Sequence, residues 1–234
     1  MSSDLWLRYL EATAGRAPRP LLLRALDRLP GFSGRGGRAL ELGAGAGSDT
    51  LALLQAGWEV LVVDATLPTL ETARELAREA GLEDRLDTRH LRFEELELVP
   101  AAFDLVHAEF ALPFCDPAHF DRLWASLRAA LRPGGIFAGQ LFGDRDTWAR
   151  APLEGVEGPM TFLARERVEQ LIEGYEVLEF EEEEGERKTA LGDLKDWHLF
   201  HLLLRRPSDG TTRVRMSPGH QGGAPGEPHA HPER

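Results

Sequence analysis

Apolar residues follow two different spacings along the chain, one typical of strands and the other of helices. Short apolar runs predict strands before Gly43 and over residues 58–64, 86–91, 103–107 and 136–142. Between these runs, apolar residues recur every three or four positions, as they do from Phe120 to Leu131, which predicts helices. Strands that alternate with helices in this way form a parallel sheet with right-handed crossovers.

The two ends of the pattern depart from this alternation. Residues 5–29 predict two helices separated by Pro18 and Pro20. Strands over 175–183 and 197–205 follow each other without a helix between them, so they are expected to form an antiparallel hairpin. The predicted fold class is therefore α/β, with a Rossmann-like, doubly wound, mostly parallel sheet of seven strands and an antiparallel C-terminal β-hairpin.

The expected domain covers residues 1–206, with 1–37 as a helical cap. The stretch 143–158 has no clear periodicity and is a candidate lid. Residues 207–234 are rich in Gly, Pro, Ser and His and are expected to be a disordered tail. The tail histidines lack ligand spacing, so no metal site is predicted.

The stretch from residue 39 to Asp64 carries the clearest chemical signal. Gly43, Gly45 and Gly47 let a backbone loop approach a ligand closely and precede a predicted helix at Ser48, whose first N–H groups are unsatisfied. Asp64 ends the next strand, where a carboxylate can accept both ribose hydroxyls of a nucleotide. These features predict a nucleoside-cofactor site.

The spacing of the glycines separates two cofactor families. A dinucleotide site prefers Gly-x-Gly-x-x-Gly, whereas this loop reads Gly-x-Gly-x-Gly with Glu41 two residues before it. That arrangement resembles motif I of the class I S-adenosylmethionine-dependent methyltransferases. Residues 103–106 and 131–135, together with the closing hairpin, also resemble this family. The segments 111–115, 137–143 and 197–201 are similar to those of small bacterial cytosolic enzymes of the tellurite-resistance type, and the likeness covers roughly residues 5–206.

The resemblance implies S-adenosyl-L-methionine as cofactor, S-adenosyl-L-homocysteine as its product, and a defined set of contacts. Glu41 would lie near the methionine ammonium group, Asp64 would hold the ribose, and Ala65 and Phe93 would flank the adenine. The full set of expected cofactor residues is Glu41, Leu42, Gly43, Ala44, Gly45, Asp64, Ala65, Arg92, Phe93, Glu94, Ala108 and Glu109.

One position departs from the family pattern. The family usually has an Asp near the adenine amine just after the third strand, and Arg92 stands at that place here. Either Glu94 supplies the carboxylate or the backbone alone contacts the adenine.

The acceptor side has weaker signals, because methyl transfer depends mainly on alignment and needs a base only where the nucleophile carries a proton. Glu109, His107 and His198 are the candidate catalytic residues, and Trp6, Tyr9, Arg19, Phe110 and Phe114 are the candidate acceptor-pocket residues. His107 and the aromatic residues are also what an ordinary core contains. His198 and His201 lie three apart on a strand and should face opposite sides.

Composition narrows the class of substrate. The chain has 27 Lys and Arg against 39 Asp and Glu, for a net charge of −12, which argues against nucleic acid. One cysteine, no apolar run of membrane-spanning length and no signal pattern favour a cytoplasmic protein that does not bind membranes. The expected partner is a small-molecule methyl acceptor, and the protein is expected to be a monomer or dimer. A non-catalytic cofactor-binding sensor or scaffold and a nicotinamide-dependent oxidoreductase are the alternatives.

Overall fold

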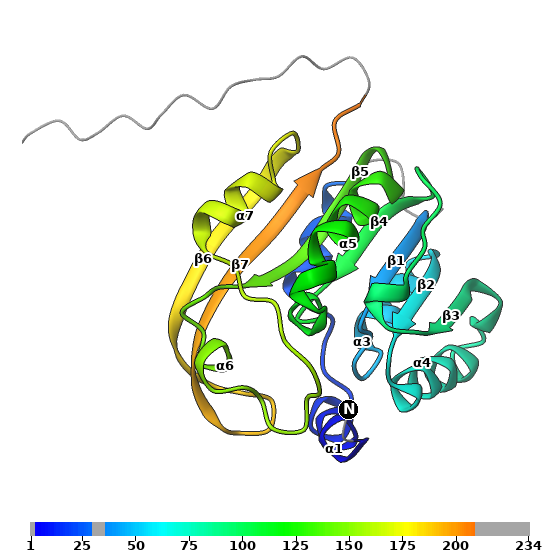
Figure 1. Cartoon of the computed structure of the whole chain (residues 1–234). Helices are drawn as coiled ribbons and strands as arrows, with labels where there is room; N and C mark the ends of the chain where they lie inside the picture. Colours follow the sequence, from blue (N-terminus) through cyan, green and yellow to red (C-terminus); the bar gives the residue numbers. More distant parts are fainter. Residues whose placement is uncertain (1–2, 30–35, 209–234) are drawn as a thin grey trace, which may run out of the picture.

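A seven-stranded sheet organises the chain (Figure 1). The computed structural model describes residues 3–29 and 36–208, so the predicted tail from residue 209 onward lies outside the described residues. The strand order is β3-β2-β1-β4-β5-β7-β6. The strands are β1 Arg38–Leu42, β2 Glu59–Asp64, β3 Leu86–His90, β4 Phe103–Ala108, β5 Leu131–Phe142, β6 Glu176–Lys188 and β7 Leu194–Arg205.

The order of the strands confirms the predicted fold class. Strands β1 to β5 pair in parallel, and β7 runs antiparallel to both β5 and β6. The reversal of strand order between β1 and β4 places the carboxyl ends of these two strands at a crevice, where open α/β sheets bind ligands.

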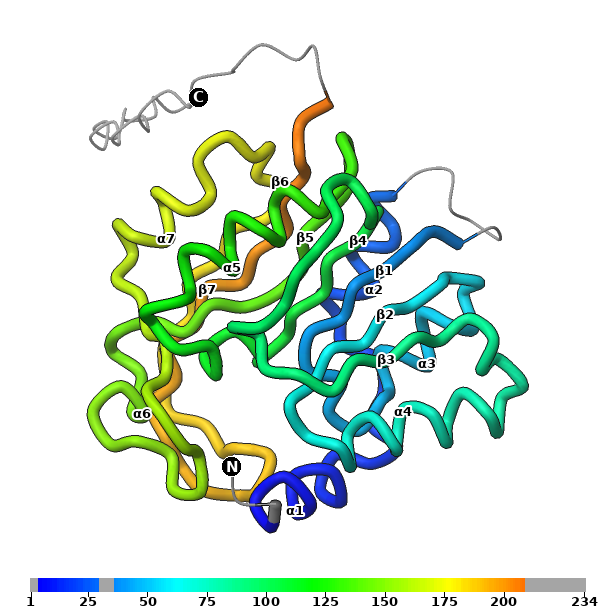
Figure 2. Tube along the Cα trace, turned by 45° about the vertical axis from the view of Figure 1, so that its right-hand side comes forward, coloured from blue at the N-terminus to red at the C-terminus, as the bar shows by residue number. Residues whose placement is uncertain are grey.

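Helices cover both faces of the sheet (Figure 2). Their bounds are α1 Ser3–Thr13, α2 Pro20–Asp27, α3 Ser48–Gln55, α4 Leu67–Glu79, α5 Pro117–Ala130, α6 Thr147–Arg150 and α7 Arg165–Leu171. Short 3₁₀ turns lie at Glu83–Arg85, Phe93–Glu95 and Leu112–Phe114. Among the described residues, no helix has the length and apolar character needed to cross a bilayer.

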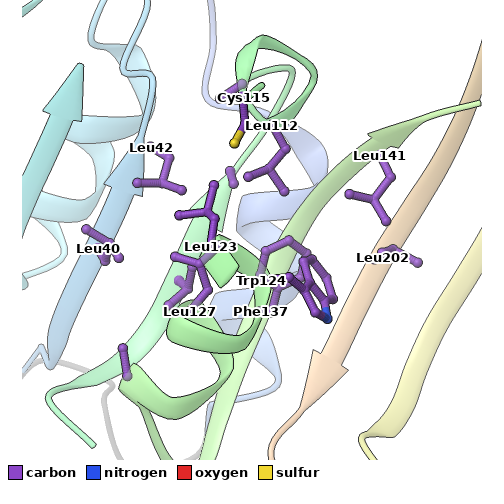
Figure 3. Close-up of a cluster of buried hydrophobic side chains, with 14 of the residues drawn as sticks. Leu40, Leu42, Leu112, Cys115, Leu123, Trp124, Leu127, Phe137, Leu141 and Leu202 are labelled. Carbon is purple, nitrogen blue, oxygen red and sulfur yellow. The ribbon is translucent and has the colours of Figure 1, made fainter. Parts of the chain in front are cut away.

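Two apolar clusters hold these layers together. On one face, Leu123, Trp124 and Leu127 of α5 pack against the sheet (Figure 3). On the other face, residues of α2, α3 and α4 surround Val60 and Val62 of β2. Because β2 is buried from both sides, it is apolar at consecutive positions instead of alternating.

One predicted turn is wrong. The run Pro133-Gly134-Gly135 is typical of a tight turn, and the fifth strand was expected to begin after it at residue 136, yet β5 begins at Leu131 and continues through the run. The pairing with β4 jumps from Phe103–Leu131 to Leu105–Ile136, so the extra residues are absorbed as an irregularity in the strand, with Gly134 at φ 82°. Pairing with β4 at both ends of this run keeps it within the sheet.

The candidate lid lies beside the crevice. The segment leaves β5 and returns to it, because Gly143 and Leu163 form a bridge and the Leu163 N–H donates to the carbonyl of Phe142 at 2.8 Å. Thr161 ties the returning arm to Cys115 through a 2.7 Å hydrogen bond from its hydroxyl group. The short helix α6 lies in the outgoing arm.

Candidate functional site

The glycine loop joins β1 to α3 at the carboxyl end of the sheet. Gly43, Gly45 and Gly47 have φ values of 73°, 52° and 77°, all in the left-handed region. A Cβ atom on Gly43 would lie 2.8 Å from the Cβ of Ala111. The loop therefore keeps its backbone bare where it borders a cavity.

Asp64 lies at the end of β2, beside the glycine loop. The residue is 8% exposed, and its Oδ1 accepts hydrogen bonds from the N–H group of Thr66 at 2.7 Å and from the Thr66 hydroxyl at 2.5 Å. Burial raises the pKa of this carboxyl group. The turn after β2 thus fixes the direction of Asp64 and leaves the carboxylate at the cavity edge.

A buried polar cluster lies beneath the loop. Glu41 accepts a hydrogen bond from the hydroxyl of Thr50 at 2.6 Å. Asp49 accepts the backbone N–H of Arg19 at 2.8 Å on one oxygen and lies 2.9 Å from Nε2 of His107 on the other. The predicted hydrogen-bonded core histidine is thus present, but its Nδ1 has no partner among the described residues.

The members of this cluster have shifted acidities. Burial raises the pKa of Glu41 from 4.5 to about 7. Burial opposes the ionised forms of both Asp49 and His107. Their mutual hydrogen bond nevertheless lowers the pKa of Asp49. The same hydrogen bond, together with the carboxylates of Glu109 and Glu41, raises the pKa of His107. A buried hydrogen bond between Asp49 and His107 therefore lies directly below the loop.

The first cavity is bordered by the glycine loop, the ends of β2 and β4, and helix α1. All predicted cofactor residues except Glu41, Leu42 and Ala108 line it. These three are buried beneath the cavity, in β1 and β4. His107 and Glu109 also border the cavity.

Arg92, which departs from the family pattern, contacts the carboxylate of Glu94. The Arg92 Nε lies 3.2 Å from Oε2 of Glu94, and Oε1 of Glu94 accepts the N–H of Asp116 at 2.8 Å. These contacts outweigh burial and lower the pKa of the Glu94 carboxyl group. A carboxylate is therefore present at the cavity edge two residues after the position where the family usually has one.

A second cavity adjoins the first. It lies between α1, the segment around α6 and the strands β6 and β7, and encloses about 1690 Å³ of space that opens to solvent. All five predicted acceptor-pocket residues line both cavities: Trp6, Tyr9, Arg19, Phe110 and Phe114. Helix α1 thus borders both cavities where they adjoin.

Phe110 forms the centre of the shared wall in a strained conformation. Its φ is 56°, which is unusual for a residue with a bulky side chain. The side chain of Gln140 holds it there by accepting the Phe110 N–H at 3.1 Å, and the guanidinium of Arg19 lies 4.6 Å above its ring.

The side chain of Gln140 also connects two titratable residues. Its amide nitrogen lies 3.3 Å from Oε2 of Glu109 and 3.3 Å from Nδ1 of His201. Glu109 is 3.5 Å from Arg19, and its Oε1 has no hydrogen-bond partner within the described ranges. This buried carboxylate faces the first cavity with one oxygen unpaired.

The third candidate catalytic residue lies elsewhere. His198 is fully buried and lines neither cavity, since its ring contacts Glu182 at 3.0 Å and accepts the N–H of Arg145 at 3.1 Å. His201 lines the second cavity, so the two histidines face opposite sides as expected. The Cys115 thiol is buried, and its pKa is raised to about 12, which suits a core residue and not a nucleophile.

Several residues of the site were missed by sequence reasoning. Asp49, Gln140, Trp148, Lys195 and Trp197 all border or support the cavities. Asp49 had a local signal, because an acid in the first turn of the helix after a glycine loop faces the bound ligand's side. The other four come from β5, α6 and β7, and only the folded chain brings them to the cavities.

Comparison with known proteins gives the family. A family model described as a methyltransferase domain matches residues 39–135. Malonyl-[acyl-carrier protein] O-methyltransferase of Salmonella typhimurium is 27% identical over 194 residues, which cover 76% of this chain and 70% of that protein.

Solved structures show the same fold. TehB from Haemophilus influenzae superposes with a TM-score of 0.66 at 17% identity, over 82% of this chain and 63% of the TehB chain. The 1,6-didemethyltoxoflavin-N1-methyltransferase of Burkholderia thailandensis, with 1,6-didemethyltoxoflavin and S-adenosylhomocysteine bound, gives 0.59 at 21% identity, over 88% of this chain and 87% of that one.

The fold and the glycine-loop site define a class I methyltransferase. The match to a methyltransferase domain over residues 39–135, together with this relative and these structures, supports a methyltransferase that takes its methyl group from S-adenosylmethionine. The resemblance stated from the sequence is confirmed, and so is the expected cofactor.

Proposed function

We propose that this methyltransferase acts on a small-molecule acceptor held in the second cavity, by in-line displacement. The observation that carries the proposal is the shared wall, since the same residues of α1, the connection between α1 and α2, and the loop after β4 line both cavities. A donor in one cavity and an acceptor in the other would meet there, and methyl transfer requires reacting atoms about 3–3.5 Å apart.

The first cavity has the features that the cofactor needs. Gly43 leaves room where a Cβ atom would collide with Ala111. Asp64 offers a fixed carboxylate for the ribose hydroxyls, and the unpaired Oε1 of Glu109 and Nδ1 of His107 are polar atoms that await a partner. We assign adenine to the space beside Ala65, Phe93 and Glu94, which lines the same cavity.

For the methionine ammonium group we propose a different contact from the one expected from the sequence. Glu41 was expected near the methionine ammonium group, but it lies beneath the loop and does not border the cavity. Asp49 and Glu109 do border it, on either side of the Arg19 guanidinium at 3.7 and 3.5 Å. We therefore assign the ammonium group to these two carboxylates and a supporting position to Glu41.

The chain's own residues would mainly align and shield the reactants. The bound cofactor supplies a methyl group already activated on a sulfonium. Phe110 separates the two cavities, and Val156 of the candidate lid and Trp6 of α1 border the first from the solvent side. Where the acceptor nucleophile carries a proton, Glu109 is the base closest to the shared wall. The helical cap is thus proposed as part of the site.

Calorimetric titration with S-adenosylhomocysteine tests the cofactor half. We expect micromolar binding to the wild type and a loss of about 1–3 kcal/mol in Asp64→Asn, because the ribose hydroxyls lose their charged acceptor. Glu59→Gln is the matched control, since Glu59 lies at the opposite, exposed end of the same strand. Equal affinity in Asp64→Asn and wild type would contradict the assignment of the ribose to Asp64. Transfer of a labelled methyl group from S-adenosylmethionine to small-molecule acceptors then tests the proposed acceptor class.

A further inference from the structure

The second cavity contains an unusual concentration of aromatic side chains. Three of the five tryptophans in the chain line it, together with Tyr9 and three phenylalanines. Apart from Tyr9, three of these rings lie at the wall shared with the first cavity: Trp6, Phe110 and Phe114. Three others line the second cavity alone: Phe142, Trp148 and Trp197. They come from α1, the loop after β4, the end of β5, α6 and β7.

Four of these rings form one connected surface, and the other two, Trp6 and Phe114, meet each other edge to face at 5.1 Å between ring centroids. Phe110 meets Phe142 and Trp197 edge to face at 6.0 and 5.8 Å between ring centroids, and Trp148 lies 5.7 Å from Trp197. A continuous aromatic surface buries a flat ring more effectively than a flexible aliphatic chain, since aromatic pairs gain stacking and edge contacts beyond their area.

A buried cation lies at the far end of this surface. The Lys195 side chain is 2% exposed, and its Nζ lies 2.5 Å from Oδ1 of the fully buried Asp146. The same Nζ lies 3.4 Å from the ring centroid of Trp148 and 3.9 Å from that of Trp197. Among the described residues, Asp146 is its one hydrogen-bond acceptor, although an ammonium group has three donors.

The carboxylate of Asp146 is shared among several donors. Its Oδ1 also accepts the N–H of Trp148 at 2.9 Å, and its Oδ2 accepts the N–H of His198 at 3.3 Å. Asp146 therefore serves the backbone around α6 as well as the ammonium group, and Lys195 keeps donor capacity toward the cavity that it lines.

The sign of the charge around the cavity is opposite to that of the whole chain. Five Lys and Arg side chains line it against three Asp and Glu, in a chain of net charge −12. Several of these rings already hold a cation over one face, Lys195 over the two tryptophans and Arg19 over Phe110, which weakens their attraction for a cationic acceptor. A second cation would meet like charges in a partly desolvated space, where repulsion is stronger than in water.

We infer that the acceptor is a planar aromatic compound that carries a carboxylate or another acidic group, with the ring on the aromatic surface and the acidic group toward Lys195. This inference rests on the proposed function, because it takes the second cavity as the acceptor site. It makes Lys195 a specificity-determining residue that acts in recognition of the acceptor.

Binding of three matched probes in the presence of S-adenosylhomocysteine tests the inference. The probes are 4-hydroxybenzoate, 4-hydroxybenzamide and 4-hydroxybenzylamine, which share a ring and differ in charge, with cyclohexanecarboxylate as the non-aromatic control. We expect the benzoate to bind at least about tenfold more tightly than the amide and the cyclohexane acid, and the amine to bind most weakly. Equal affinities, a preference for the amine, or no binding of any probe at millimolar concentration would overturn the inference.

Variants then test the role of Lys195. Lys195→Met removes the charge at similar length, and the double variant Lys195→Met with Asp146→Asn avoids an unpaired buried carboxylate if the single variant does not fold. Both should lose the preference for the benzoate over the amide, while the exposed rim variant Lys188→Met should keep it. A preserved preference in the double variant would overturn the role of Lys195.

These outcomes differ from a failure of the proposed function. Unchanged S-adenosylhomocysteine affinity shows that the variants are folded and that the first cavity is intact. If the wild type prefers the benzoate but transfers no methyl group to any aromatic acid, the recognition chemistry stands and the proposed acceptor reaction fails.

Discussion

Replacing Glu41 by glutamine tests whether the acid beneath the glycine loop is held there at a cost in stability. The side chain is 2% exposed, and its carboxyl group has a pKa raised from 4.5 to about 7 by burial. The folded state binds the Glu41 proton more tightly than the unfolded state does. The free energy of unfolding therefore contains the full favourable contribution of the protonated carboxyl group below pH 4.5, and this contribution is lost as the pH rises through about 7.

The magnitude follows from the two pKa values. The difference between 4.5 and about 7 corresponds to about 3 kcal/mol, at 1.36 kcal/mol for each pKa unit. Glutamine cannot ionise, yet it keeps a carbonyl oxygen for the hydroxyl group of Thr50, which donates at 2.6 Å. Glu41→Gln should therefore be more stable than the wild type by up to about 3 kcal/mol at pH 8, and should have no such advantage at pH 4.5. The figure is an upper limit, because the new amide N–H₂ group needs partners of its own.

Urea unfolding between pH 4.5 and 8 measures this difference. Glu59→Gln provides the control, since its side chain is 68% exposed on the neighbouring strand β2. The reasoning is refuted if the free-energy difference between Glu41→Gln and the wild type is the same at both ends of the pH range, or if the variant is the less stable protein at pH 8.

Two further substitutions address the catalytic and loop geometry. Glu109→Gln keeps the shape of the side chain but cannot accept a proton and no longer offers a charge to the cofactor's ammonium group, so kcat should fall about 10²-fold or more and KM for the cofactor should rise; unchanged turnover would place the base elsewhere. Gly43→Ala should abolish S-adenosylhomocysteine binding because its Cβ would lie 2.8 Å from that of Ala111, whereas Gly81→Ala, at a similar positive φ with nothing within 4 Å, should only lower stability by about 1–2 kcal/mol. If the two glycine variants bind the cofactor equally, the close approach of Ala111 has no role.

The sheet could be predicted because its central strands carry their own signal. Strand β2 is apolar at consecutive positions since both faces are covered, and β4 is buried at all six positions. The start of β5 could not be predicted in this way. Its Pro133 and Gly134 have the chemistry of a turn, and only the pairing of the flanking residues with β4 and the hydrogen bonds of Gly134 and Gly135 with Arg206 keep them within the sheet.

The glycine-loop part of the first cavity could be predicted because its residues lie close together in the sequence. A glycine loop and the acid at the end of the next strand are local features, and parallel pairing of β1 with β2 brings them together without further information. The hydrogen bond between Asp49 and His107 joins residues 58 positions apart. It depends on the neighbouring positions of β1 and β4 in the sheet, which the order of elements along the chain does not state.

The acceptor half shows where sequence reasoning stops. The strand predicted over 197–205 begins after Lys195, whereas β7 begins at Leu194, and alternation along it puts Lys195 on the same face as Trp197 and His201. What the sequence does not show is that α6 returns Asp146 and Trp148 to the other side of the same ammonium group. A lysine read from its sequence alone is a solvent-exposed cation, whereas the fold surrounds this one with a carboxylate and two indole rings. The property that we assign to Lys195, selection of an acidic aromatic acceptor, therefore arises from the contact between two segments and from neither segment alone.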